Sequence, residues 1–88
     1  MSSSLPVQTV QLVVLDRIDP ARNMARYYYV LSIEPTLFDG SSLVRQWGMI
    51  GKPGRRRIEL YRDDGNARIA LSAWLARKAR RGDKTRPA

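Results

Sequence analysis

The sequence predicts an α+β fold, in which a small antiparallel sheet of about four strands is packed by one long C-terminal helix. Residues 7–62 contain four segments rich in β-branched and aromatic residues, and short links with glycine, proline or asparagine separate them. The last quarter of the chain instead carries apolar residues at helical spacing. Four consecutive strands with short links favour an antiparallel meander, and 88 residues fit one domain.

The predicted strands span residues 7–16, 26–34, 42–50 and 56–62. In the second strand Tyr27 and Tyr29 share a face with Leu31 and Ile33, so we expect these two tyrosines to lie in the core or in cross-strand pairs. The fourth strand is expected to point Ile58 and Leu60 inward. Residues 19–23 and 51–55 have the composition of turns, and the loop 34–41 is expected to tuck Leu37 and Phe38 under the sheet edge.

The predicted helix has about sixteen residues and begins after Asp63 or Asp64, either of which can cap its free N–H groups. Gly82 can close the helix in a left-handed conformation. The expected buried stripe is Ala67, Ala70, Leu71, Trp74 and Leu75. We therefore expect a flexible lead at residues 1–6, one domain over 7–82 and a flexible tail at 83–88.

Charge and composition favour a binding protein. Sixteen Lys and Arg residues against eight Asp and Glu give a net charge of +8, and thirteen of the sixteen are arginine, whose planar fork of donors suits phosphate. A polyanion is the first partner to consider, with nucleic acid ahead of a membrane surface; the alternative is that the charge serves solubility. The chain has no cysteine and no histidine, which removes disulfides, the usual zinc sites, the common general base and a thiol nucleophile. We expect no enzyme activity, no metal and no cofactor.

The N-terminal residues lack the positive and apolar regions of a secretion signal, which predicts an intracellular, cytoplasmic domain. The candidate nucleic-acid-binding surface joins an aromatic residue to the cations around the predicted third turn: Arg45, Trp47, Lys52, Arg55, Arg56 and Arg57. The alternative for Trp47 is a place in the core. A secondary candidate is the cluster of Arg77, Lys78, Arg80 and Arg81, although cations in a last helical turn also complement the helix dipole.

Residues 19–82 resemble the WGR domain, which is named for a Trp-Gly-Arg tripeptide. The matching features occur in family order: Asn23, Arg26-Tyr27-Tyr28, the alternation through Leu31 and Ile33, Trp47-Gly48, Ile50-Gly51, Gly54, the arginine-bearing strand, and a helix with Ala70, Trp74, Lys78 and Arg80-Arg81-Gly82. In poly(ADP-ribose) polymerases this domain helps to bind DNA at strand breaks near a 5′ end and relays that binding to neighbouring domains. Stand-alone bacterial proteins are similar to it. Trp47 matches the position that packs against a DNA sugar in the polymerases.

Two positions depart from the family pattern. Met49 replaces the arginine of the tripeptide, and Asp83 follows Arg81-Gly82 where many relatives carry an aromatic residue. Methionine forms neither a phosphate contact nor an ion pair, so the interdomain role is not carried over. The resemblance implies a non-enzymatic module that binds nucleic acid, with DNA favoured over RNA, at the backbone or a strand end with little sequence preference. The alternative is a protein–protein interaction module or small assembly subunit that uses the same sheet face on an acidic protein, and Met49 beside Trp47 favours it.

Overall fold

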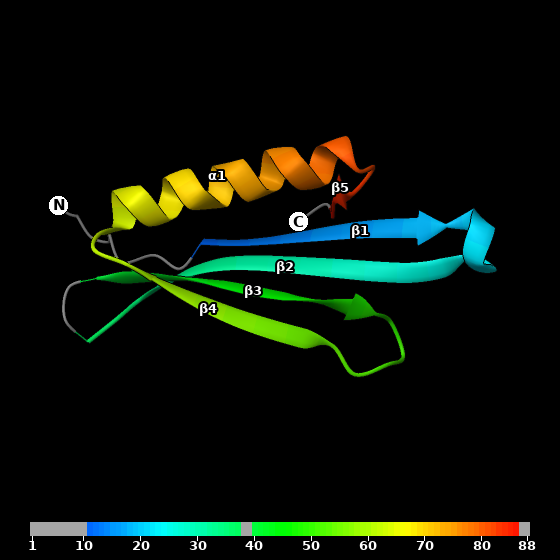
Figure 1. Cartoon of the computed structure of the whole chain (residues 1–88), viewed down its shortest axis with the longest axis horizontal. Helices are drawn as coiled ribbons and strands as arrows, with labels where there is room; N and C mark the ends of the chain where they lie inside the picture. The colour runs from blue at the N-terminus through cyan, green and yellow to red at the C-terminus, as the bar shows by residue number, and fades with distance from the viewer. Residues whose placement is uncertain (1–10, 38–39, 87–88) are drawn as a thin grey trace, which may run out of the picture.

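The computed structural model describes residues 11–37 and 40–86. Along the chain it contains β1 (Gln11–Asp19), a short 3-10 helix (Pro20–Arg22), β2 (Ala25–Pro35), β3 (Ser41–Met49), β4 (Arg55–Tyr61), α1 (Asp64–Arg80) and β5 (Lys84–Thr85). The strands form one antiparallel sheet in the order β4-β3-β2-β1-β5, and α1 lies along one face of it (Figure 1). The α+β prediction and the four-strand meander are confirmed, and the sheet has a fifth strand. The expected lead, residues 7–10 of the first predicted strand, and Phe38 lie outside the described residues.

Strand register decides which residues face α1. Tyr29 pairs with Leu15 on one side and with Trp47 on the other, so alternate residues of three strands point toward the helix. The buried core on this face consists of Leu15, Tyr29, Leu31, Ile33, Leu43, Ala67 and Leu71. The predicted helical stripe is confirmed, because Ala70, Trp74 and Leu75 pack against this core.

Local chemistry accounts for the ends of the elements. The Asp63 side chain accepts from the Asn66 N–H at 2.8 Å, which caps α1 as predicted. At the other end Gly82 has φ +98°, and the N–H groups of Gly82 and Asp83 donate to Ala79 and Lys78 carbonyls at 3.1 Å. This pair of bonds is a Schellman motif, and it turns the chain back toward β1.

Two expectations for the fold are wrong. Ile58 and Leu60 are 52% and 76% exposed, because pairing with β3 points the alternate residues of β4, Arg57, Glu59 and Tyr61, toward the helix side. Leu37 is 93% exposed and does not tuck under the sheet. Within the predicted tail, Lys84 and Thr85 form β5, which pairs with Leu15 and Asp16, and residues 87–88 lie outside the described residues.

Candidate nucleic-acid interface

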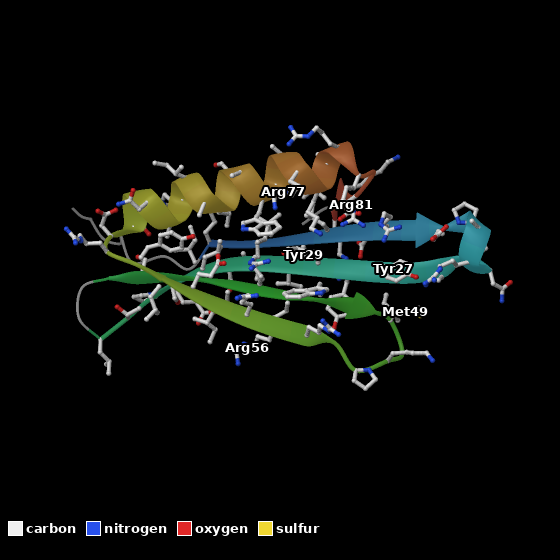
Figure 2. The ribbon with its side chains drawn as sticks, in the orientation of Figure 1. Tyr27, Tyr29, Met49, Arg56, Arg77 and Arg81 are labelled. Carbon is white, nitrogen blue, oxygen red and sulfur yellow. The ribbon has the colours of Figure 1, made fainter. Side chains whose placement is uncertain are left out.

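A cleft of about 350 Å³ lies on the helix side of the sheet, beside the C-terminal end of α1. Its described lining comes from strands β1, β2 and β3 and from the turn after the helix: Leu15, Arg17, Tyr27, Tyr28, Tyr29, Trp47, Gly48, Met49, Lys78, Arg81 and Asp83. In Figure 2 Tyr27, Met49 and Arg81 gather around this end of the molecule. The cleft therefore combines aromatic rings with three cations and one carboxylate.

Trp47 serves both the core and the cleft. Its ring stacks on Tyr29 with a centroid distance of 5.7 Å and an interplanar angle of 17°, and Tyr29 in turn stacks on Trp74 at 6.2 Å. The indole is half-buried, packs against the core and also lines the cleft. The two alternatives drawn from the sequence, an open surface and a core position, each describe part of its environment.

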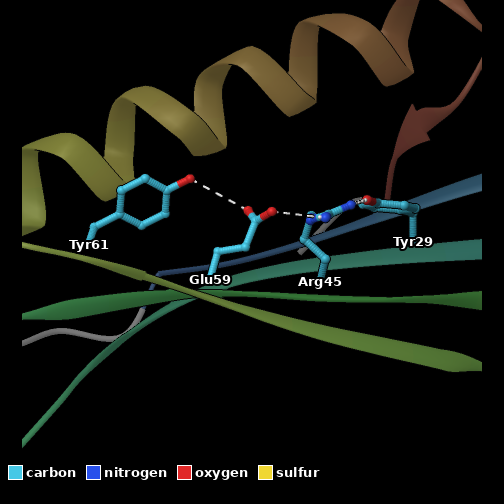
Figure 3. A network of polar contacts seen from close by, with 4 residues as sticks. All are labelled: Tyr29, Arg45, Glu59 and Tyr61. Carbon is cyan, nitrogen blue, oxygen red and sulfur yellow. Dashed lines mark hydrogen bonds and ion pairs between the residues drawn. The ribbon is translucent and has the colours of Figure 1, made fainter.

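Arg45 does not belong to an exposed cationic surface. The residue is 7% exposed and faces α1, where its guanidinium donates to the Tyr29 hydroxyl at 3.0 Å and to Glu59 Oε2 at 3.1 Å (Figure 3). It also lies 4.0 Å from the centroid of the Trp74 ring. Burial opposes its charge, but the bonds to Tyr29 and Glu59 outweigh burial and raise the pKa of Arg45 above its ordinary value. Arg45 is thus a buried cation with structural contacts. Its burial does not fit the expected role of contacting a phosphate.

The four cations expected around the third turn, Lys52, Arg55, Arg56 and Arg57, are exposed but do not share one face of the sheet. Arg55 and Arg57 pair with Trp47 and Arg45, so they lie on the cleft side. Arg56 pairs with Gln46 and points away from α1 (Figure 2). Lys52 lies in the link between β3 and β4. None of these four is among the described residues that line the cleft.

The secondary cluster at the end of α1 is divided as well. Lys78 and Arg81 line the cleft, whereas Arg77 lies over the Trp74 ring at 4.5 Å and Arg80 is exposed outside the lining. Lys78 Nζ lies 4.3 Å from the centroid of Tyr29. Burial and the nearby guanidinium of Arg81 lower the pKa of Lys78.

Arg17 and Asp83 are cleft residues that sequence reasoning missed. The Arg17 guanidinium lies over the Tyr27 ring at 4.6 Å, and its Nε is 3.0 Å from Asp83 Oδ1. That oxygen has no aligned hydrogen bond among the described residues, so the contact is an ion pair without hydrogen-bond geometry. These two residues are 66 positions apart in the sequence, and only the Gly82 turn brings them together. Period-two alternation with Leu15 was the one available signal for Arg17.

Glycines after Trp47 let the link between β3 and β4 pack closely against Tyr28, and Tyr28 and Gly48 line the cleft. A Cβ on Gly48 would lie 2.9 Å from Gly54 Cα and 3.1 Å from the Tyr28 hydroxyl, and a Cβ on Gly54 would collide with the same hydroxyl. The 50–54 link therefore closes over Tyr28 only if both positions lack a side chain. Gly51 has φ +92° and allows the turn that the Lys52 N–H closes on the Met49 carbonyl at 3.1 Å.

Residues 11–37 and 40–86 contain no helix that is long and apolar enough to cross a membrane. Across the same ranges no group of three or more acidic side chains is placed to hold a metal ion.

Comparison with known proteins identifies the family. The family model described as "WGR domain" matches residues 11–87. The chain is 38% identical over 85 residues to "Uncharacterized protein y4dW" of Sinorhizobium fredii (strain NBRC 101917 / NGR234), in an alignment covering 97% of this chain and 41% of that protein. No solved structure matches the chain. The family match over residues 11–87 agrees with the sequence of glycine and aromatic positions along the chain and with the sheet and its C-terminal helix. The chain therefore belongs to the WGR domain family.

Proposed function

We propose that this protein is a non-enzymatic module that binds nucleic acid, DNA in preference to RNA, through the cleft at the end of α1. The carrying observation is that Trp47 and Tyr27 lie beside Arg17, Lys78 and Arg81, with Asp83 as the one carboxylate in the described lining. An aromatic ring offers a stacking surface to a sugar or base, and the cations offer phosphate contacts. Both kinds of contact are independent of base identity, which supports binding with little sequence preference. The same features accommodate a strand end, where an unstacked terminal nucleotide can enter the cleft.

Electrostatics support the same proposal. Three cations and one carboxylate leave an excess of positive charge in the cleft. Burial lowers the pKa of Lys78 most and the charge of Arg81 lowers it next; Asp83 opposes this, and Arg17 and Arg45 add to the repulsion. A phosphate entering the cleft would relieve this repulsion, because an anion stabilises every cation that it approaches.

Fluorescence anisotropy with nicked, blunt and single-stranded DNA tests the proposal. With phosphate contacts from the three cations of the cleft, the affinity for duplex should fall with a log–log salt slope of about −0.9 per contact. If the protein bound none of the nicked, blunt and single-stranded DNAs at low salt, the proposal would be wrong.

The helix end provides a matched pair of variants. Arg81 lines the cleft, whereas neighbouring Arg80 is exposed outside it. Arg81→Gln is expected to weaken binding by about 3–10-fold and to reduce the salt slope by about one contact, while Arg80→Gln changes affinity less than about twofold. Equal losses in the two variants would show that overall charge, and not the cleft, carries binding.

One observation favours the second candidate, a protein-interaction module. Leu12, Ile58 and Leu60 are exposed on the sheet face opposite α1, and apolar side chains gathered on one face are typical of protein contacts. This second candidate differs from the expectation drawn from Trp47 and Met49, because it would use the opposite face of the sheet. A pull-down before and after nuclease treatment separates the cases: partners lost with nuclease support nucleic acid, and partners that survive and depend on Leu60 support protein.

A further inference from the structure

β4 is a free edge of the sheet and carries exposed side chains along most of its length. It is the terminal strand in the order β4-β3-β2-β1-β5, and β3 is the one strand that pairs with it among the described residues (Figure 1). The outer side of Arg55–Tyr61 therefore presents backbone N–H and C=O groups that a further strand can pair with. The side chains of β4 decide which strand this edge accepts.

The charges of β4 are segregated along the strand. Its first three residues are arginines, and its last four are Ile58, Glu59, Leu60 and Tyr61. Three cations on an edge repel any strand that brings further cations against them. A second β4 that runs antiparallel instead brings its uncharged and acidic half against the arginines. The strand is thus complementary in charge to a second copy of itself.

We propose that a second copy of this chain docks on the free edge of β4, antiparallel to it and centred on Ile58, so that the two sheets become one. A twofold axis perpendicular to the sheet passes between the two Ile58 residues. In this register Arg57 lies opposite Glu59 of the second copy, and the symmetry repeats the pair.

Other twofold registers along β4 oppose like charges. Opposite residues of an antiparallel pair lie on the same side of the sheet, so a symmetric pairing is centred on a single residue. A centre at Arg56 or Arg57 sets arginine against arginine, and a centre at Glu59 sets the two carboxylates against each other. With the centre at Ile58, each arginine faces a residue of another kind: Arg55 faces Tyr61, Arg56 faces Leu60 and Arg57 faces Glu59.

On the helix side the ion pairs have a free acceptor. Pairing with β3 directs Arg57 and Glu59 to this side, and Arg57 is exposed. Glu59 is 31% exposed and binds Arg45 through Oε2 at 3.1 Å. A carboxylate has about four acceptor positions on its two oxygens, so Glu59 can accept from the second copy's Arg57 without releasing Arg45.

On the opposite face the same register covers apolar surface. Ile58 and Leu60 are 52% and 76% exposed. The two Ile58 side chains would lie opposite each other, and each Leu60 would lie diagonal to Ile58 of the second copy, within reach of a long side chain. Four exposed apolar side chains thus become one cluster across the axis, which gives a reason for their place on an edge strand.

The expected association is weak and leaves the cleft aside. A single strand pair falls below the roughly 1,200 Å² of a stable interface, so we expect a Kd of about 10–100 μM and a monomer in dilute solution. The described lining of the cleft contains no residue of β4. The twofold axis also keeps α1 of both copies on the same side of the joined sheet. The inference therefore does not depend on the proposed nucleic-acid binding.

Cysteine variants test the register, because the native chain has no cysteine. In Ile58→Cys the two Cβ atoms lie about 4.5–5.5 Å apart across the axis, close enough for cross-linking by mild oxidation or a short bifunctional thiol reagent. Leu60→Cys is the matched control: Leu60 is more exposed and lies on the same face, but its two copies are offset by about 13 Å along the strands. Ile58→Cys should cross-link at least about tenfold faster than Leu60→Cys.

A charge reversal tests the ion pairs. Arg57→Glu sets a carboxylate against Glu59 of the second copy at two places, and it should raise the Kd of self-association at least about tenfold. Arg80→Glu makes the same change in charge at an exposed position of α1 and should alter the Kd less than about twofold. Sedimentation equilibrium of nuclease-treated protein measures the Kd without association through nucleic acid. Circular dichroism melts confirm that both variants are folded.

Three results would each overturn the proposal. The first is a protein that stays monomeric up to about 0.5 mM. The second is equal cross-linking of the two cysteine variants, and the third is equal weakening by Arg57→Glu and Arg80→Glu. DNA binding is measured with dilute protein, where the chain is expected to be monomeric, so its outcome decides the proposed function alone.

Discussion

Replacing Arg45 by methionine is expected to destabilise the protein without a change in the nucleic-acid affinity of the folded state. The variant loses a buried hydrogen bond to Tyr29, a charged bond to Glu59 and the contact of the guanidinium with the Trp74 ring at 4.0 Å. The first contributes about 1 kcal/mol. The second contributes about 0.5–1 kcal/mol, because Glu59 is 31% exposed and water replaces part of the bond. The ring contact contributes about 0.5–1 kcal/mol.

The free energy of unfolding should therefore fall by about 2–3 kcal/mol, because methionine refills most of the volume of the arginine stem. Urea denaturation followed by circular dichroism measures this change. Arg57→Met is the matched control: Arg57 pairs with Arg45 across the strands but is exposed, so its replacement should stay within about 0.5 kcal/mol. In the double variant with Glu59→Gln the losses should be less than additive, because the carboxylate without its partner is also removed. A stable Arg45→Met protein with clearly weakened DNA binding would refute the structural role of Arg45.

Three further predictions follow from individual contacts. Gly54→Ala should lower the free energy of unfolding by about 1–3 kcal/mol in urea denaturation, because its Cβ would collide with the Tyr28 hydroxyl. The hydrogen bond from Arg86 lowers the pKa of Asp16, so Arg86→Gln should lower the melting temperature at pH 7. The difference from wild type should disappear below the lowered pKa, because the Asp16 carboxyl is then protonated in both the folded and the unfolded state. The pKa of Lys78 is lowered by folding, so Lys78→Met should raise the melting temperature at pH 7. This gain should shrink as the pH rises through 10.5, because the wild-type amine then loses its proton in the unfolded state as well.

The parts of the fold that follow local rules could be predicted from the sequence. The alternation of Tyr29, Leu31 and Ile33 identified the buried face of β2, and the helix spacing identified Ala67 and Leu71. In β4 the same rule gave the wrong face, since Ile58 and Leu60 are its apolar alternating pair. Pairing with β3 instead directs Glu59 and Tyr61 toward the helix side, where Glu59 meets Arg45 and lies 3.5 Å from the Tyr61 hydroxyl (Figure 3). The side of β4 that faces the helix carries Glu59, which pairs with the buried Arg45 of β3. The hydrophobicity of the β4 segment alone does not reveal this pairing.

The candidate site was predictable only where its residues lie close together in the sequence. Trp47 and the end of α1 were both singled out, and the structure brings Trp47 together with Lys78 and Arg81. Arg17 and Asp83 depend on β5, a two-residue strand that forms because the Gly82 turn returns the chain to β1. No periodicity can be recognised in the two residues of β5, so its return to β1 had no signal in the sequence, although alternation with Leu15 could have placed Arg17 on this face.

The composition of the cleft is itself an argument for a binding role. Packing alone would place apolar groups between the end of α1 and the sheet, yet this lining holds Arg17, Lys78 and Arg81 against the single carboxylate of Asp83. Burial and like charges disfavour the ammonium of Lys78, so the arrangement reduces the stability of the free protein. Residues that stay in such surroundings are typical of functional sites, where a ligand compensates the repulsion. Under the proposed function, a phosphate bound in the cleft would provide that compensation. Arg81 lines the cleft and Arg80 does not, so these adjacent residues of equal charge are expected to differ in their effect on binding.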